Sequence, residues 1–529
     1  MRLRSVLQLN ARSSPESRRT AAIAAIWSVP LGVELVRVLS LGWFPTFDIG
    51  FLQLRAFDVG TSRTPLVGMP STISLATGEA TFHPGPLQSW LAAPLVRLFA
   101  FSPAAMLLAQ VLLNLLWIFL AAWMVARSVS RIGMAVIAGS VALVGLGPEV
   151  LHDPWNPHAA VLPLAVALLA MVLVVRGERR WSWIAVLSGS YAAEAHLSDL
   201  APAMIAMVVV LFLVTRTSGS RRTTVATWLV FVACWTGPII DQVFGRGNLL
   251  HILGAGADGE ALGWGDAWSR FVRVMMPWRL PLDRSVSAVD LVASVGLIEH
   301  LLTVLVLVGA VLAFRDRRSG SWGRAGFVAL SIVGTQTMVT ALTPMTLGSL
   351  FGVHVARSWW PVTWILWLCI AGAIHGIVDW RPVIGHRVGA VMATAIAVGA
   401  IGWAATVEQS DLRDGTWFAL TRDTADALAR ELSSGAYDLE TRGSPFESPL
   451  PVGVTADLAR RGRDVRVVGP VTAGLLHADR AAETGDDRER VVMVVDDGSA
   501  VVDRPEGAPD VTVSDLVGDT TVTIEVWIG

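Results

Sequence analysis

The residues best suited to chemistry fall into two polar clusters, each set between long apolar segments. One cluster, within residues 44–102, includes two carboxylates, a guanidinium group and an imidazole: Asp48, Glu79, Arg55 and His83. The other, within residues 150–158, includes a carboxylate, an imidazole and an indole: Asp153, His158 and Trp155. A carboxylate can act as a general base and a guanidinium group can bind phosphate. A solvated loop position accounts equally well for any one residue of the first cluster taken alone.

A rigid turn is predicted at residues 83–86, which read HPGP. Two prolines around a glycine restrict the backbone, so the turn would aim Glu79 and His83 back toward the loop. The segment that follows, residues 86–101, is short and contains a proline and an arginine. We therefore expect it to form an interfacial helix on the outer surface rather than a span.

The second cluster includes residues 153–157, which read DPWNP and separate two predicted helices. Asn156 and the proline after it fit the cap and first turn of the second helix, so local structure accounts for both. It does not account for Asp153 or His158. Trp155 between them fits a membrane-interface aromatic residue, which is the more common case, or a platform on which a sugar stacks.

Long apolar segments dominate the rest of the chain. Of its 529 residues, 53% are hydrophobic and 16% are charged, whereas soluble proteins carry about a quarter charged residues. We read eleven apolar segments as membrane-spanning helices, most of them long enough to cross a bilayer core: 21–43, 103–126, 132–150, 157–175, 182–195, 199–215, 225–244, 290–314, 325–344, 358–378 and 388–406. The stretch 182–215 is divided at a turn because Glu194, His196 and Asp199 lie in its middle.

Arginine clusters distinguish the two sides of the membrane. Six segments, including the N-terminal tail of residues 1–20, hold 19 Arg and four acidic residues, and the positive-inside rule makes their side cytoplasmic. No cleavage pattern follows the first apolar segment, so we expect a first span and not a removed signal. The extracytoplasmic side then holds the loops 44–102, 150–158 and 245–289. It also holds residues 407–529, because the number of spans is odd.

The C-terminal segment differs from the helical body of residues 21–406 in both charge and pattern. Residues 407–529 contain 24 acidic residues and 12 Arg, a net charge of −12, against +10 for the rest of the chain. A helix and three strands are expected there: 421–434, 465–469, 491–496 and 520–527. This pattern predicts a small extracytoplasmic α/β domain.

These motifs together resemble the C superfamily of membrane glycosyltransferases (GT-C), which includes the protein O-mannosyltransferases and the lipid A aminoarabinose transferase. The resemblance is carried by FDIG at 47–50, PLVG at 65–68, HPGPL at 83–87 and DPWNP at 153–157. It covers roughly residues 20–215. It implies a polytopic α-helical membrane protein of the GT-C type with about eleven transmembrane helices.

The resemblance further implies inverting transfer of a sugar from a polyprenyl-phosphate carrier to a cell-envelope glycan, lipid or protein outside the plasma membrane. Asp48 matches the family's first-loop acid and is the expected base. Asp153 matches the acid of the second external loop, and Glu79 lies where some relatives carry another. Asp48 is followed by Ile49 where the family commonly has a second acid. Asp153 also lacks the neighbouring acid of the metal-dependent members, so we expect no required cofactor and find no support for a divalent metal.

A leaving phosphate needs cationic or hydrogen-bonding partners, and bidentate contact favours arginine. Several external arginines qualify, Arg246 among them, and the preferred substrate- or phosphate-binding residues are Arg55, His83, His158, Arg273 and Arg357. Arg273 lies in the loop 245–289, where basic and aromatic residues are interleaved. That pattern predicts an amphipathic helix that covers a lipid groove or is simply anchored at the headgroups.

Two other functions also fit the sequence. A transporter or flippase of lipid-linked sugars would place ionisable residues within its spans, and here Glu34 and Arg37 of the first span are one turn apart and can pair. A non-catalytic scaffold would use the acidic C-terminal domain to bind an envelope partner. We find no nucleic-acid-binding module. The expected partners are therefore a polyprenyl-phosphate sugar, membrane lipid and the envelope acceptor.

Overall fold

The computed structural model describes most of the helical body and most of the C-terminal domain. The described residues are 15–71, 73–74, 80–128, 138–140, 143, 146, 148–216, 220–255, 260–275, 295–343, 357–378, 399, 415–442, 450–468, 489–496, 504–517 and 520–528. Two predicted spans, 132–150 and 388–406, lie largely outside these residues. Glu79 also lies outside them.

Within the described residues, seven helical stretches are long and apolar enough to cross a membrane. They are α2 (Pro15–Ser40), α6 (Ala105–Ser128), α9 (Asn156–Ala159) with α10 (Val161–Val175), α12 (Leu197–Arg216), α18 (Leu297–Arg315), α19 (Ser321–Leu342) and α22 (Trp359–Ile377). An eighth is the pair α13 (Arg221–Cys234) and α14 (Thr236–Phe244), bent by 48°. Each coincides with a predicted span, so the chain is a multi-pass membrane protein. The total of eleven spans stays a prediction.

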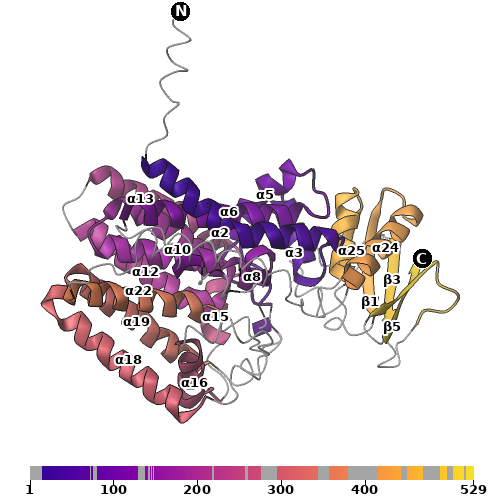
Figure 1. Ribbon diagram of the computed structural model, residues 1–529. Coiled ribbons are helices and arrows are strands. Elements are labelled where there is room, and N and C mark those ends of the chain that lie inside the picture. The colour runs from indigo at the N-terminus through magenta and orange to yellow at the C-terminus, as the bar shows by residue number, and fades with distance from the viewer. Residues whose placement is uncertain are drawn as a thin grey trace, which may run out of the picture.

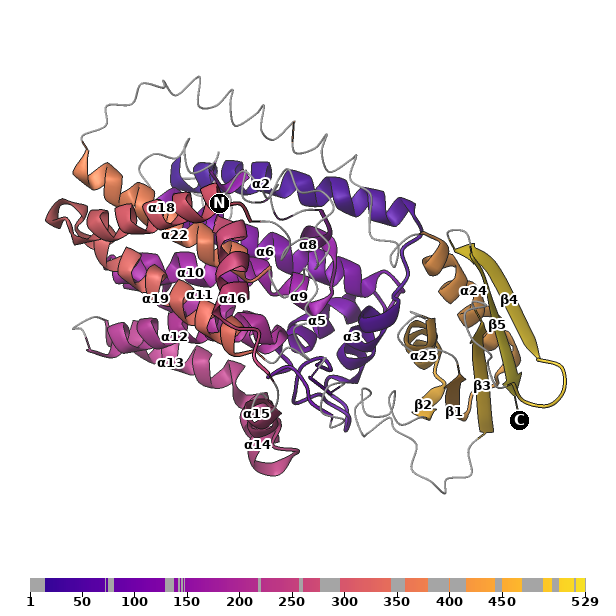
Figure 2. The same cartoon turned by 90° about the horizontal axis from the view of Figure 1, so that it is seen from below.

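The division of residues 182–215 into two helices is confirmed. α11 (Ser182–Ala195) ends at His196, whose backbone is extended with φ −148° and ψ 134°, and α12 begins at Leu197. At 1.5 Å per residue, the 14 residues of α11 extend about 21 Å, less than the roughly 30 Å of a bilayer core. The helix is buried almost throughout and packs against α10 and α12 (Figure 2).

The first segment predicted to be external contains a helix where a loop was expected. α3 (Phe47–Asp58) packs against α5 (Leu87–Leu98) at the end of the helical body nearest the C-terminal domain (Figure 1). α5 is the helix expected at residues 86–101. An isolated β-bridge between Pro70 and Phe82 joins the chain between the two helices. The remaining described elements of the body are α8 (Pro148–His152), α15 (Asn248–Ala255), α16 (Trp264–Met275), η1 (Arg179–Trp181) and η2 (Arg317–Ser319).

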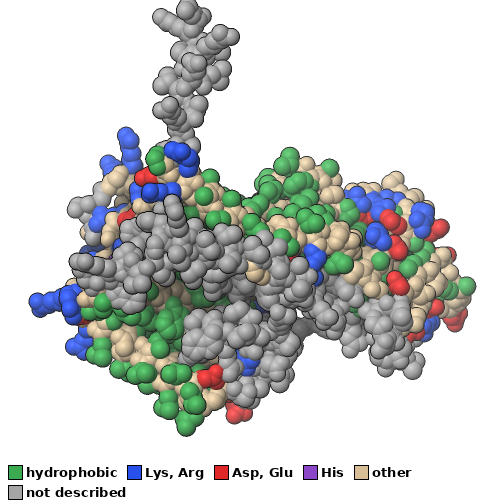
Figure 3. All heavy atoms as spheres, viewed as in Figure 1, with side chains coloured by type: hydrophobic (Ala, Val, Ile, Leu, Met, Phe, Trp, Pro, Cys, Tyr) green, Lys and Arg blue, Asp and Glu red, His purple; other side chains and the backbone are tan. Residues whose placement is uncertain are grey.

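Basic side chains gather at the end of the helical body that lies away from the C-terminal domain. In Figure 3 they collect over the start of α2, near α13 and at the connection between α18 and α19. That connection contains Arg317 and Arg318, and α13 begins at Arg221. These residues belong to the segments predicted to be cytoplasmic. α3 and α5 lie toward the opposite end (Figure 1).

The C-terminal domain is an α/β domain, as predicted. Its five strands form one sheet in the order β2-β1-β3-β5-β4, parallel across β2, β1 and β3 and antiparallel across β3, β5 and β4. They are β1 (Ala436–Arg442), β2 (Asp464–Val468), β3 (Glu489–Asp496), β4 (Val511–Val517) and β5 (Thr520–Ile528). Two helices of the domain lie within the described residues, α24 (Gly415–Glu431) and α25 (Leu450–Arg460), with α25 next to the helical body (Figure 2). The sequence pattern predicts α24, β2, β3 and β5, but not β1, β4 or α25.

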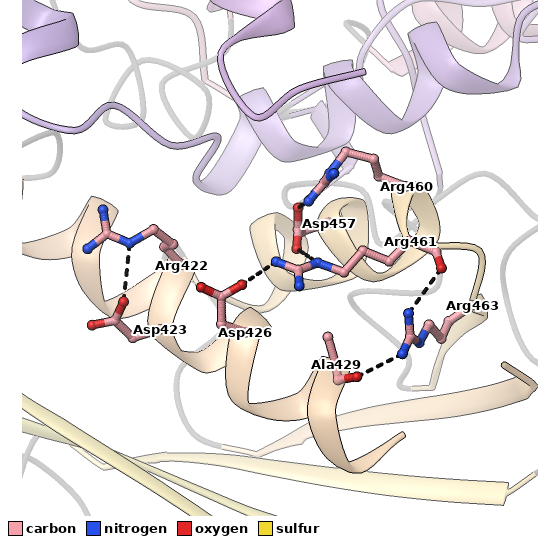
Figure 4. Close-up of polar contacts among 8 residues, drawn as sticks. All are labelled: Arg422, Asp423, Asp426, Ala429, Asp457, Arg460, Arg461 and Arg463. Carbon is pink, nitrogen blue, oxygen red and sulfur yellow. Dashed lines mark hydrogen bonds and ion pairs between the residues drawn. The ribbon is translucent and has the colours of Figure 1, made fainter. Parts of the chain in front are cut away.

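A cluster of ion pairs ties α24 to α25 (Figure 4). The side chain of Asp457 on α25 is 1% exposed and accepts hydrogen bonds from Arg460 and Arg461. Arg461 also pairs with Asp426 on α24. One guanidinium group therefore bridges carboxylates of both helices, which joins them into a single layer.

We expect Asp457→Ala to lower the unfolding temperature of the C-terminal domain, because two guanidinium groups lose a buried acceptor. Hydrogen bonds to charged groups contribute about 1.5–3 kcal/mol. Asp423→Ala is the matched control, since Asp423 is 56% exposed in its pair with Arg422 and such pairs contribute little. Thermal unfolding of the purified full-length protein measures both variants. Equal losses in the two would contradict a special role for the Asp457 cluster.

Candidate active site

Asp48 lies in the first turn of α3, at the end of the helical body that faces the C-terminal domain. Its half-buried carboxylate is held by Trp155, whose indole Nε1 donates to Oδ2 at 2.6 Å. The partial positive charge of the helix N-terminus also attracts a carboxylate in this position. The two predicted polar clusters, 107 residues apart in the sequence, therefore meet at this hydrogen bond.

Asp153 and His158 pair within residues 150–158, the second segment predicted to be external. Asp153 Oδ2 lies 2.7 Å from His158 Nδ1, and both side chains are almost completely buried. Asp153 Oδ1 accepts the backbone N–H of Trp155 at 3.1 Å. Asp48 and Asp153 are thus linked through one residue, Trp155. Among the residues that the structure describes, no group of three or more His, Cys, Asp or Glu side chains is placed to hold a metal ion.

The prediction that Asn156 caps the following helix is wrong. The N-cap is Trp155, Asn156 is the first helical residue, and no side-chain hydrogen bond caps the helix. The amide of Asn156 instead donates to the carbonyl of Ala195 at 3.0 Å. Tertiary packing places the end of α11 beside this loop, and the carbonyl there is the acceptor that the amide reaches. The proline expected in the first turn is present as predicted.

The turn at residues 83–86 places His83 against the start of α12. The His83 N–H donates to the Met69 carbonyl at 2.8 Å, and its Nδ1 accepts the N–H of Leu197 at 3.1 Å. Because Nδ1 accepts, a neutral His83 ring carries its proton on Nε2. The ring also lies against His196, with centroids 4.9 Å apart and planes 35° apart.

Glu194 holds this turn in place, a role that its position in the sequence does not predict. It is fully buried near the C-terminal end of α11. Its Oε2 accepts the N–H of Leu87, the first residue of α5, at 3.1 Å, and its carbonyl accepts the N–H of Gly85 at 3.3 Å. A Cβ at Gly85 would lie 2.2 Å from Oε2, so the carboxylate occupies space that only glycine leaves open. The signal in the sequence is a carboxylate within the apolar stretch 182–195.

Two further hydrogen bonds hold the segment of residues 150–158. Gln88 of α5 donates through Nε2 to the carbonyl of Pro154 at 2.7 Å. Asn114 of α6 donates to the carbonyl of Leu151 at 2.8 Å. Together with the contacts of Asp48 and Asn156, these bonds fasten the segment to α3, α5, α6 and α11.

Two arginines approach the ring of Phe82. Arg55 is 6% exposed, its Nη2 donates to the carbonyl of Val67, and its Cζ lies 5.9 Å from the centre of the ring. Arg246, which follows α14, has its Cζ 5.4 Å from the same centre. Asn248 accepts the N–H of Phe82 at 2.9 Å and so fastens the Arg246 segment to the first cluster. Segments that are distant in the sequence thus bring two guanidinium groups to one ring.

Arg273 on α16 and Arg357 just before α22 belong to two helices that pack against each other, away from Phe82. α16 is the helix expected in the loop 245–289, and it packs against α18, α19 and α22 with Arg273 only 8% exposed. This burial is more than anchoring at the headgroups requires. Phe271 of α16 contacts Trp359 of α22, with ring centroids 5.6 Å apart. Arg357 immediately precedes α22, with its Cζ 5.8 Å from the ring of Trp360.

The sequence matches no protein-family profile and no curated protein. Solved structures do match the fold. One is the crystal structure of ArnT from Cupriavidus metallidurans bound to undecaprenyl phosphate, with a TM-score of 0.47 and 13% sequence identity, covering 96% of this chain and 97% of that chain. At this identity the similarity concerns the course of the chain and assigns no role to any residue.

The role of Glu194 is testable with two substitutions of similar volume. Glu194→Gln keeps an oxygen that can accept the N–H of Leu87, whereas Glu194→Met removes it. We expect Glu194→Met to destabilise the protein by about 1–3 kcal/mol more than Glu194→Gln, because a buried N–H loses its acceptor. Thermal unfolding in detergent measures the difference. Equal unfolding temperatures for the two variants would show that the carboxylate does not hold the turn.

Proposed function

We propose that this protein transfers a sugar from a polyprenyl-phosphate carrier to a cell-envelope acceptor, with Asp48 as the general base. The observation that carries the proposal is the hydrogen bond of 2.6 Å between Trp155 and Asp48, because it holds the carboxylate beside an indole. A general base must be held within hydrogen-bond reach of the proton that it removes. The indole offers a flat apolar face against which a sugar ring can pack.

In the proposed step, the acceptor oxygen attacks the anomeric carbon of the donor sugar. The bond from that carbon to the phosphate oxygen breaks, and its electron pair leaves with the polyprenyl phosphate. The proton of the acceptor hydroxyl passes to the carboxylate of Asp48. A single displacement of this kind inverts the anomeric centre. Asp153 is paired with His158, and its part is to hold Trp155 in position.

In this proposal the leaving phosphate is met by Arg55 and Arg246 and not by a metal ion. Arg55 is nearly buried, and the attraction between opposite charges grows as water is excluded. His83 lies in the same cluster, where its Nε2 proton is suited to donation to a sugar or phosphate oxygen. Arg273 and Arg357 form the alternative phosphate site.

We infer that the reaction takes place outside the plasma membrane. What supports this is that α25 packs on α3, so the C-terminal domain and Asp48 lie at one end of the helical body. Basic side chains gather at the other end (Figure 3), and the positive-inside rule assigns that end to the cytoplasm. On this reading the N-terminus is cytoplasmic and the C-terminal domain is extracytoplasmic.

A flippase of lipid-linked sugars is the second candidate, and one observation favours it. Glu34 is fully buried in α2, and ionisable residues within spans are typical of translocation pathways. Its Oε2 lies 3.2 Å from Arg37 Nε, which confirms the predicted pair, and 3.9 Å from His152 Nδ1. The same pairing also satisfies the buried charge, so it fits a structural role in a transferase.

Asp48→Asn is expected to lower sugar transfer by about 10²–10⁴-fold, because an amide cannot take the proton of the acceptor. Asp58→Asn, the same change at the other end of α3, is the matched control and should retain transfer. The assay uses protein in liposomes, a panel of polyprenyl-phosphate hexoses and pentoses, and an envelope fraction as the acceptor. Full activity of Asp48→Asn would exclude Asp48 as the base. Translocation of the lipid-linked sugar without transfer would favour the flippase.

Replacing the arginines tests the phosphate site. We expect Arg55→Met and Arg246→Met each to weaken binding of added undecaprenyl phosphate by about 10- to 100-fold, the effect of losing a charge-assisted hydrogen bond. Arg273→Met is the comparison variant and should bind normally. Native mass spectrometry of the purified protein measures the bound fraction. If the first two variants bind normally and Arg273→Met loses binding, the phosphate site lies at α16 instead.

A further inference from the structure

α25 of the C-terminal domain crosses α3 at a point where both helices carry glycine. A Cβ on Gly50 would lie 2.8 Å from the backbone nitrogen of Gly453 and 2.8 Å from the carbonyl carbon of Val452. A Cβ on Gly453 would lie 2.2 Å from the carbonyl oxygen of Pro45. These neighbours are backbone atoms, which cannot rotate away as a side chain can. Neither glycine can therefore be enlarged unless one helix moves.

The close approach explains why glycine occupies both positions. Glycine within a helix destabilises the helix relative to alanine, so its presence at both positions needs a compensating reason. Here the reason is contact between two backbones. Pro45 and Gly50 lie on either side of Asp48 in the sequence, so this contact brackets the candidate base.

Other contacts hold the same region of the helical body against the domain. The ring centroids of Trp43 and of Phe418 on α24 lie 6.1 Å apart. Arg63, beyond the end of α3, pairs with Asp464 at 3.0 Å. Because the Asp457 cluster joins α25 to α24 (Figure 4), the domain meets this region as one unit.

The geometry of α3 connects this contact to the candidate base. Residues in an α-helix advance by 100° each, so Asp48 and Gly50 point about 200° apart and lie on nearly opposite faces. The face of Gly50 meets α25, and the face of Asp48 meets Trp155. A displacement of α3 away from α25 is therefore a displacement relative to Trp155.

We propose that the C-terminal domain positions the first turn of α3 through the contact of Gly453 with Pro45 and Gly50. Gly453 and Gly50 are then positioning residues for Asp48, and the domain belongs to the machinery of the reaction although it contributes no catalytic group. This inference rests on the proposed function, in which Asp48 is the base.

The first test measures the position of α3 without measuring activity. Asp48→Cys introduces a thiol that a water-soluble maleimide can label, and the two native cysteines, Cys234 and Cys369, are buried. We expect Gly453→Ala to change the labelling rate severalfold, because the added Cβ moves the first turn of α3 relative to Trp155. Gly334→Ala on α19 is the matched control, since a Cβ there meets nothing within 4 Å. It should leave the labelling rate unchanged.

The second test uses the transfer reaction. Gly453→Ala is expected to lower kcat about tenfold, which corresponds to ~1.4 kcal/mol of transition-state stabilisation, and to leave the KM for the donor unchanged. Trp155→Phe removes the indole N–H and should lower kcat by itself. If both changes act through the contact of Asp48 with Trp155, the fold-decrease in kcat of the double variant is smaller than the product of the two single fold-decreases.

Gly50→Ala places the same clash on the other helix and leaves the sequence of the C-terminal domain intact. This variant therefore distinguishes a change in the position of α3 from misfolding of the C-terminal domain. An unchanged labelling rate with both Gly453→Ala and Gly50→Ala would overturn the positioning role. A fold-decrease in kcat of the Gly453→Ala, Trp155→Phe double variant that equals the product of the two single fold-decreases would overturn it too. Absence of transfer in every variant, the parent included, would remove the proposed function. A changed labelling rate in that case would still establish that the domain holds α3.

Discussion

The hydrogen bond from Trp155 to Asp48 is the interaction on which the arrangement of the site depends. It joins two segments 107 residues apart at a distance of 2.6 Å. Trp155 is held by Asp153, and Asp153 is held by His158, so each polar group in the series has its position set by the next. Reactions between separately held groups are sensitive to misplacement, since an error of about 1 Å can lower a rate by about 10²-fold.

Buried carboxylates and close backbone contacts keep the helices around this bond in place. Glu194 fixes the start of α5 and the turn that carries His83, while Glu34 is satisfied by Arg37 within α2. A carboxylate in an apolar helix is stable only with a partner, which comes from the same helix for Glu34 and from another segment for Glu194. On the other side of α3, the approach of Gly453 to Gly50 fastens the acidic domain to the body.

Features that depend on neighbouring residues could be predicted from the sequence. Apolar length predicts the described spans, and the polar residues around His196 predict the break between α11 and α12. The spacing of Glu34 and Arg37 predicts their pairing, because residues three apart lie on one face of a helix. The members of the two polar clusters could also be identified from the sequence. An ionisable residue next to an apolar segment must be hydrated or paired, so each such residue stands out.

Only the tertiary structure decided which of these residues meet. α3 was expected as a loop because its residues are buried almost all round, which removes the one-sided pattern of a surface helix. Asn156 resembles a cap, yet its amide binds the carbonyl of Ala195 because packing brings that carbonyl within 3.0 Å. The contact of Asp48 with Trp155, and the separate location of Arg273, arise in the same way. The sequence by itself determined which residues need partners, whereas the packing of distant helices decided which partners they have.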